Sequence, residues 1–198
     1  ETLRAAWGWI VGRLKPDLAS LRKTRADAAV APLLAALAAP VVATEEAPYL
    51  DLASAPDFAA YEQRYSSHAR RNRRRLMRRL GENGTVTVDY FERGEDARAL
   101  ATIGIAMKRG WLKRRGEVSR ALTDERFAAF FADVAEGRGR DAGCLVSALR
   151  SDGELGAVQI AIAAKGMIAM HVIVTGAKVE RFGAGLLHLE GTIKRSFE

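Results

Sequence analysis

Residues 169–197 have the sequence AMHVIVTGAKVERFGAGLLHLEGTIKRSF, and this stretch decides the fold that we expect. Its residues 170–175 are rich in β-branched side chains, which predicts a strand. Gly176 ends that pattern, and a second glycine cluster follows at Gly183 and Gly185. Apolar residues then recur at helical spacing, at Leu186, Leu189, Ile193 and Phe197. The stretch therefore predicts a strand, a glycine loop and a helix, in that order.

The glycine loop in front of this predicted helix has the features of an anion site. The first backbone N–H groups of a helix have no partner within the helix, and the helix dipole adds partial positive charge at the same point. Phosphate is the usual occupant of such a site. Glycines also occur between a strand and a helix simply because the turn requires their backbone conformation. The loop by itself therefore leaves two interpretations open, an anion site and a structural turn.

The composition is that of a soluble globular protein, with 48% apolar and 28% charged residues in 198. The net charge of +7 favours anionic partners: the phosphates of CoA, nucleic acid or an anionic membrane surface. A single cysteine, Cys144, excludes an internal disulfide and fits a reducing compartment. With three histidines far apart in the sequence, we expect no metal site.

Neither a membrane span nor a signal peptide is expected. The longest uncharged run, residues 28–44, is short and interrupted by Pro32 and Pro40. We therefore expect a cytoplasmic location, with peripheral attachment at the inner membrane as an option. The sequence begins without a methionine and stops inside the last predicted helix, so we expect an excerpt of a longer protein.

The first quarter of the chain predicts small elements. In order, they are a helix at residues 1–14, a strand at 17–25, a helix at 27–38 begun by an Asp27 cap, and short strands at 41–44 and 49–52. Residues 45–48 are the predicted linker.

An arginine-rich helix is predicted at residues 67–80, after a helix at 58–65. A serine starts it, Gly81 stops it, and no acid lies between Glu62 and Glu82. Like charges spaced by four residues destabilise a helix. Something must offset this repulsion: an anionic ligand, acidic neighbours or a membrane face.

The remaining elements predict an α+β (mixed α/β) domain with a mostly antiparallel sheet flanked by helices. They are a strand at residues 85–91, helices at 96–114 and 123–136, and a meander of strands at 143–150, 154–164 and 167–175 with turns at 151–153 and 165–166. The apolar stripe of the second helix is expected in the core. It consists of Phe127, Phe130, Phe131 and Val134.

The loop and the order of elements together resemble a known family. Residues 180–185, ERFGAG, resemble the pyrophosphate loop of the GNAT acyltransferases, Gln/Arg-x-x-Gly-x-Gly/Ala, with Glu180 departing at the first position. The run from residue 48 to the end resembles the GNAT branch related to cellulose-biosynthesis acetyltransferases, which is itself similar to tandem Fem-type transferases. The matching features are residues 49–52 (YLDL), 67–80, 109–111 (RGW), 122–127 (LTDERF), the meander and 180–187.

The resemblance implies a domain organisation and a reaction. Residues 1–47 would be the C-terminal part of a first GNAT-like half, and residues 48–198 a second acyltransferase domain that lacks its last strands. The reaction would be acyl transfer from a thioester, usually acyl-CoA, to an amine. Such a reaction needs the two substrates held together, a donor for the carbonyl oxygen and a destination for the proton of the amine.

The resemblance also implies site residues. The strand before the loop would pair with the pantetheine arm through the backbone of Val172, Ile173 and Val174. The pyrophosphate would lie on the N–H groups of the loop, Arg181, Phe182, Gly183, Ala184 and Gly185.

Two residues are candidates for the general base. His171 lies on the strand before the loop and titrates near neutrality. Glu154 begins the middle strand of the meander, where a GNAT base can reside. Each has a structural alternative: His171 as a strand histidine bonded to a neighbour, and Glu154 as a solvated turn residue.

The arginine-rich helix has several interpretations. Arg71, Arg74 and Arg75, together with Trp111, are candidates to bind the acceptor or an anion. As a binding element, the helix would take one of three partners: phosphates of CoA or of a nucleotide-linked acceptor, an anionic membrane surface, or RNA. The structural alternative is a solvated basic face with acidic neighbours.

The leading hypothesis is an acyl-CoA-dependent N-acyltransferase of bacterial envelope biosynthesis that acts on an amino sugar of a polysaccharide. The alternatives are a lipid amine such as a sphingoid base, aminoacyl-tRNA-dependent Fem-type transfer, and a non-catalytic RNA- or membrane-binding module.

Overall fold

The computed structural model describes all residues except 22–23, 47–48, 83, 138–142 and 165. The chain forms two compact units, Glu1–Leu50 and Asp51–Glu198. The helices and strands of the first unit are α1 (Thr2–Leu14) and α2 (Ala31–Ala36). Those of the second unit are α3 (Phe58–Glu62), α4 (Ser67–Gly81), β1 (Val86–Phe91), α5 (Glu95–Arg115), α6 (Arg120–Thr123), α7 (Glu125–Glu136), β2 (Gly143–Ser151), β3 (Glu154–Ala164), β4 (Met167–Thr175), α8 (Ala177–Glu180) and α9 (Ala184–Arg195).

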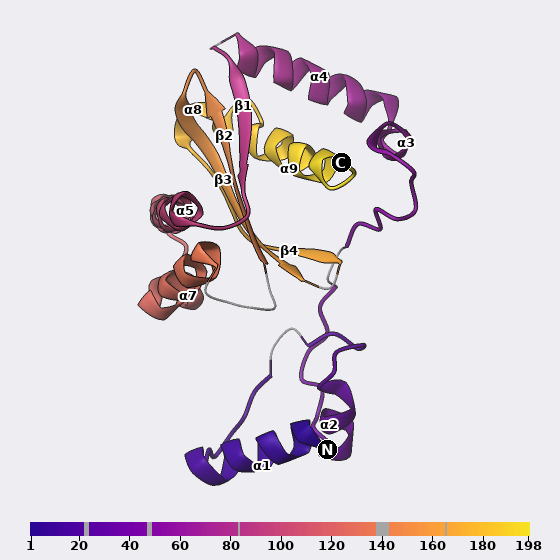
Figure 1. The fold of residues 1–198 in the computed structure, drawn as a ribbon, viewed down its shortest axis with the longest axis vertical. Helices are drawn as coiled ribbons and strands as arrows, with labels where there is room; N and C mark the ends of the chain where they lie inside the picture. The colour runs from indigo at the N-terminus through magenta and orange to yellow at the C-terminus, as the bar shows by residue number, and fades with distance from the viewer. Residues whose placement is uncertain (22–23, 47–48, 83, 138–142, 165) are drawn as a thin grey trace. The chain divides into compact units, whose positions relative to one another are not determined.

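The strands of the second unit form an antiparallel sheet in the order β1-β2-β3-β4 (Figure 1). The β2–β3 hairpin turns at Asp152 and Gly153, whose φ angles of 52° and 77° suit a tight two-residue turn. The pairing of β3 with β4 shifts between Ile160 and Ala161, which leaves His171 as an extra residue in β4. The mixed fold and the antiparallel meander are confirmed. Lys165, of the second predicted turn, lies outside the described residues.

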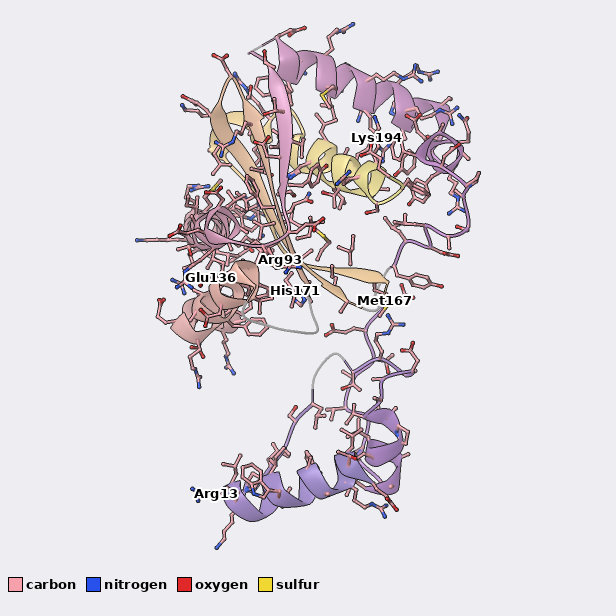
Figure 2. The ribbon with its side chains drawn as sticks, viewed as in Figure 1. Arg13, Arg93, Glu136, Met167, His171 and Lys194 are labelled. Carbon is pink, nitrogen blue, oxygen red and sulfur yellow. The ribbon has the colours of Figure 1, made fainter. Side chains whose placement is uncertain are left out.

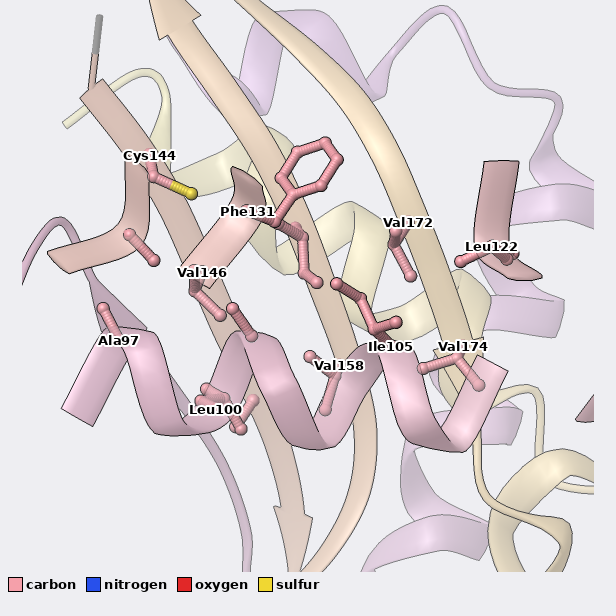
Figure 3. Close-up of a cluster of buried hydrophobic side chains, with 14 residues drawn as sticks. Ala97, Leu100, Ile105, Leu122, Phe131, Cys144, Val146, Val158, Val172 and Val174 are labelled. Atoms are coloured by element: carbon pink, nitrogen blue, oxygen red, sulfur yellow. The ribbon is translucent and has the colours of Figure 1, made fainter. Parts of the chain in front are cut away.

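One face of the sheet packs against α5 and α7 (Figure 3). Strand residues that share this face, such as Val146, Val158 and Val174, meet Ile105 of α5 and Phe131 of α7. These side chains are at most 3% exposed, so they form the main hydrophobic core. The stripe predicted for α7 is confirmed in part only. Phe131 is buried, but Phe130 is 51% exposed because it lies on the outer side of the helix.

The opposite face of the sheet packs against α9, and α4 lies along α9 (Figure 1). A second apolar cluster joins Leu80 of α4, Leu149 of β2 and Leu187 of α9. The serine cap predicted for α4 is present. Ser66 caps α4 by accepting a hydrogen bond from the Ala69 N–H (3.1 Å).

The first unit departs most from the sequence prediction. Helix α1 is confirmed, but the second helix is confined to α2, and Asp27 forms an ion pair with Arg25 instead of a cap (2.7 Å). The strands predicted at 17–25, 41–44 and 49–52 are wrong, because the described residues of these segments contain no strand; residues 22–23 lie outside them. A short extended segment needs a neighbouring strand to pair with, and none is present here. The first unit ends at Leu50, near the predicted linker, of which residues 47–48 are not described.

Candidate active site

The glycine loop joins β4 to α9 through the short helix α8. Gly183 precedes α9 as its N-cap and has a φ of 69°, a left-handed conformation that glycine adopts without a steric penalty. The Phe182 and Gly183 N–H groups already donate to the Val179 and Glu180 carbonyls (both 3.0 Å). The first intrahelical bond of α9 runs from the Leu187 N–H to the Gly183 carbonyl (3.1 Å).

Three consecutive backbone amides at the start of α9 are therefore left without a partner. Those of Ala184, Gly185 and Leu186 donate to no acceptor among the described residues, and no side chain caps the helix. Such amides, together with the helix dipole, favour an anion. The free donors thus lie at the C-terminal part of the predicted loop and extend to Leu186, which the loop motif did not include.

The side chains of the loop lie beside α4. Phe182 is buried in the second apolar cluster. The guanidinium of Arg181 lies over its ring at 4.7 Å from the centroid, and that of Arg79 at 5.9 Å. Two guanidinium groups, one from the loop and one from α4, therefore lie beside Phe182, close to the start of α9.

Glu180 is turned toward α5. Its carboxylate accepts a hydrogen bond from the Trp111 indole N–H (3.4 Å). The Trp111 ring is also covered by Lys108 (4.1 Å) and Arg115 (4.6 Å). Glu180, which departs from the loop motif, is thus bonded to Trp111 and lies near the cationic side chains that cover this ring. Trp111 itself lies on the α5 side of the sheet and the arginines of α4 on the α9 side, so the structure does not bring these candidates together.

Strand β4 is an edge of the sheet within the part of the chain that the structure describes, since it pairs with β3 alone. Val172 and Val174 are 2% and 3% exposed and point into the core, whereas Ile173 is exposed. Over residues 172–174, the backbone along this edge pairs with no further strand among the described residues, which is the arrangement that backbone pairing with a pantetheine arm requires.

His171 is the extra residue at the β4 bulge (Figure 2). Its ring lies against the Phe131 ring, with centroids 5.3 Å apart, and it remains accessible to solvent. Desolvation by its neighbours lowers the pKa of His171 below its usual value. The lowered pKa favours the neutral imidazole, the state in which it accepts a proton. Bulges often re-aim side chains at functional sites.

Glu154 lies in a different environment. It is exposed and forms an ion pair with Lys178 of α8 (2.8 Å). The hydrogen bond from Lys178 lowers the pKa of Glu154, which makes its carboxylate a weaker base. Ile160 of β3 lies next to His171 of β4, and it is six residue steps from Glu154 along β3, so His171 and Glu154 are about 20 Å apart along the strands. They do not belong to one site.

A buried polar group beneath α9 escaped the sequence analysis. The His188 Nε2 and the Ser147 hydroxyl share a hydrogen bond (2.8 Å), and the Thr192 hydroxyl donates to the Gln159 side-chain oxygen (2.7 Å). Burial lowers the pKa of His188 to about 4. These side chains meet only because α9 packs against β2 and β3. A single sequence gives no signal for such a contact.

Within the described residues, no group of three or more His, Cys, Asp or Glu side chains is arranged to hold a metal ion. Among the helices that the structure describes, none has both the length and the apolar character needed to span a bilayer.

Comparison with known proteins identifies the family. Residues 67–198 match the model of the acetyltransferase (GNAT) domain, and this match covers most of the chain. The chain therefore belongs to the GNAT acetyltransferase family and is an N-acyltransferase, which transfers an acyl group to an amine. No curated protein and no solved structure gives a significant match. The branch, cellulose-biosynthesis-like or Fem-type, and the division into tandem halves stay predictions.

Proposed function

We propose that the chain transfers an acyl group from acyl-CoA to an amine of bacterial envelope biosynthesis, an amino sugar of a polysaccharide. The observation that carries the acyl-CoA part is the set of three unpartnered amides, Ala184 to Leu186, behind a left-handed Gly183. They would hold the pyrophosphate of CoA, with Arg181 beside them. GNAT domains generally use acyl-CoA as co-substrate, which supports the same assignment.

The edge of β4 would carry the pantetheine arm from this anion site toward the acceptor. Backbone groups of Val172, Ile173 and Val174 would pair with its amides. The amine nitrogen would then attack the thioester carbonyl carbon. The C–S bond breaks, the sulfur leaves as the CoA thiolate, and the nitrogen loses a proton to neutral His171 or to water.

The second candidate acceptor is a lipid amine such as a sphingoid base. Exposed arginines on α4 favour it, because they suit an enzyme that meets its acceptor at an anionic surface. Transfer from aminoacyl-tRNA is the remaining alternative within the family, and an RNA- or membrane-binding module without catalysis is the alternative outside it.

The test is amine-dependent release of CoA thiol. Acetyl-CoA and palmitoyl-CoA would each be mixed with an amino sugar or with a sphingoid base, and the free thiol measured with a chromogenic disulfide. Leu186→Asp should abolish release, because its carboxylate would take the place of the phosphate among the amides, whereas the matched Leu186→Asn should retain it. The proposal fails if neither class of amine stimulates release from either thioester.

A further inference from the structure

Three arginines on the outer side of α4 have no partner. Arg71, Arg74 and Arg78 are exposed, and no hydrogen bond or ion pair joins them to any residue that the structure describes. Residues spaced by three, four and seven share one face of a helix, so these arginines form a row with Arg75. The Arg75 guanidinium donates to the neutral Asn72 amide (2.9 Å) and meets no carboxylate. We call Arg71, Arg74, Arg75 and Arg78 the arginine face.

The inner arginines of the same helix have structural roles. Arg70 donates to the Tyr65 carbonyl (2.8 Å). Arg73 forms an ion pair with Glu190 of α9 (3.2 Å), and its guanidinium lies 3.8 Å from the centroid of the Tyr65 ring. Packing within the domain therefore explains Arg70 and Arg73. Packing does not explain the arginine face, whose positive charges repel one another and have no acidic partner among the described residues.

We propose that the arginine face docks the chain on the anionic surface of a phospholipid membrane. From Arg71 to Arg78 the row spans about 10 Å along the helix axis. A membrane presents a flat array of negative charge, and each basic side chain near it adds attraction independently. Met77 is 44% exposed and follows Arg74 by three residues, so an apolar side chain lies at the border of the face, as in helices that lie at a bilayer surface.

The surroundings of α4 favour a membrane over nucleic acid. Proteins that bind single-stranded nucleic acid combine a basic groove with exposed aromatic rings on which bases stack. The aromatic rings near α4 are already covered: Tyr61 is 3% and Phe182 8% exposed, and Tyr65 lies under Arg73. The arginine face itself carries no aromatic residue. The inference does not rest on acyl transfer, because docking requires neither acyl-CoA nor an acceptor.

The experiment is co-sedimentation of the 198-residue chain with vesicles, at low and at high salt. The vesicles contain phosphatidylcholine alone or phosphatidylcholine mixed with phosphatidylglycerol. We expect binding to the mixed vesicles only, and weaker binding at high salt because exposed charges are screened. The triple variant Arg71→Gln, Arg74→Gln, Arg78→Gln should bind roughly 100-fold more weakly, about fivefold per arginine.

The matched control removes the same charge elsewhere. Arg93, Arg114 and Arg120 are exposed and form no ion pair with the residues that the structure describes, and their combined change to Gln should alter binding by less than about threefold. Helix content and melting temperature are measured for both triples to show that each is folded. Equal losses in the two triples, or no binding of the wild type to anionic vesicles at low salt, would overturn the proposal. Binding of a uridine homopolymer in place of vesicles, lost selectively in the first triple, would assign the face to nucleic acid and would equally overturn it.

Discussion

Leu76 of α4 lies against Gly183 at the start of α9. A β-carbon on Gly183 would come within 2.9 Å of the leucine Cδ1, closer than real contacts allow. The φ of Gly183, 69°, is also a conformation that other residues rarely adopt. The backbone therefore favours glycine at this position, and any larger residue would also force the Leu76 side chain to move. The same contact holds the arginine-rich helix beside the proposed anion site.

Gly183→Ala should lower the free energy of unfolding by roughly 2–3 kcal/mol, from the combined effect of overpacking and a left-handed alanine. In a Leu76→Ala background the same change should lower it by only about 1 kcal/mol, because the clash is removed and the backbone strain remains. Chemical denaturation of the four proteins measures this difference. An equal effect in both backgrounds would show that Leu76 does not restrict Gly183.

Stability should decrease as the pH falls below 6.5, because of His188. The folded pKa of about 4 lies below the unfolded value of 6.5, so the unfolded chain binds the proton more readily. The stabilising contribution is complete above pH 6.5 and is lost between pH 6.5 and about 4, a difference of about 3 kcal/mol. His188→Asn should flatten the stability curve in this window. Parallel curves for the two proteins would contradict the assignment to His188.

His171→Gln should lower kcat by about 100-fold if His171 accepts the proton of the amine. The lowered pKa of His171 puts the acidic limb of the rate profile below pH 6.5, and this limb should disappear in the variant. Glu154→Gln is the control and should leave both the rate and the profile almost unchanged, since Glu154 is exposed and paired with Lys178. An unchanged acidic limb in His171→Gln would leave water as the proton acceptor.

Cys144 should not react with thiol reagents in the folded chain. It is 2% exposed, and burial raises the pKa of its thiol to about 11, so almost no thiolate is present at neutral pH. A chromogenic disulfide should give no signal with the native protein and one thiol per chain after denaturation. A rapid native signal would disprove the burial of Cys144 and would add a background to the CoA-release assay.

The elements that sequence analysis predicted well are those with local signals. The β2–β3 hairpin has two apolar runs around an Asp152–Gly153 turn, and α4 has a serine cap and a terminal glycine, so short-range rules suffice. The alanine- and proline-rich first unit offers weak periodicity, and its predicted strands have no partners.

Parts of the site depend on contacts distant in sequence, which no local rule contains. The bulge that leaves His171 without a partner residue on β3 becomes evident only from the pairing of β4 with β3. The contact of Leu76 with Gly183 joins residues more than 100 positions apart. The glycine pattern could indicate an anion site, but which amides remain free follows only from the hydrogen bonds of α8 and α9.

The most direct test of acyl-CoA binding at the glycine loop is the melting temperature with CoA, acetyl-CoA or palmitoyl-CoA, at fixed protein and salt concentration. We expect a saturable increase for the wild type and for Leu186→Asn, because a ligand that binds only the folded state stabilises it. Leu186→Asp should fold but show no increase, since its carboxylate competes for the amides of Ala184 and Gly185. No increase with any of the three ligands, or an equal increase in Leu186→Asp, would contradict the account.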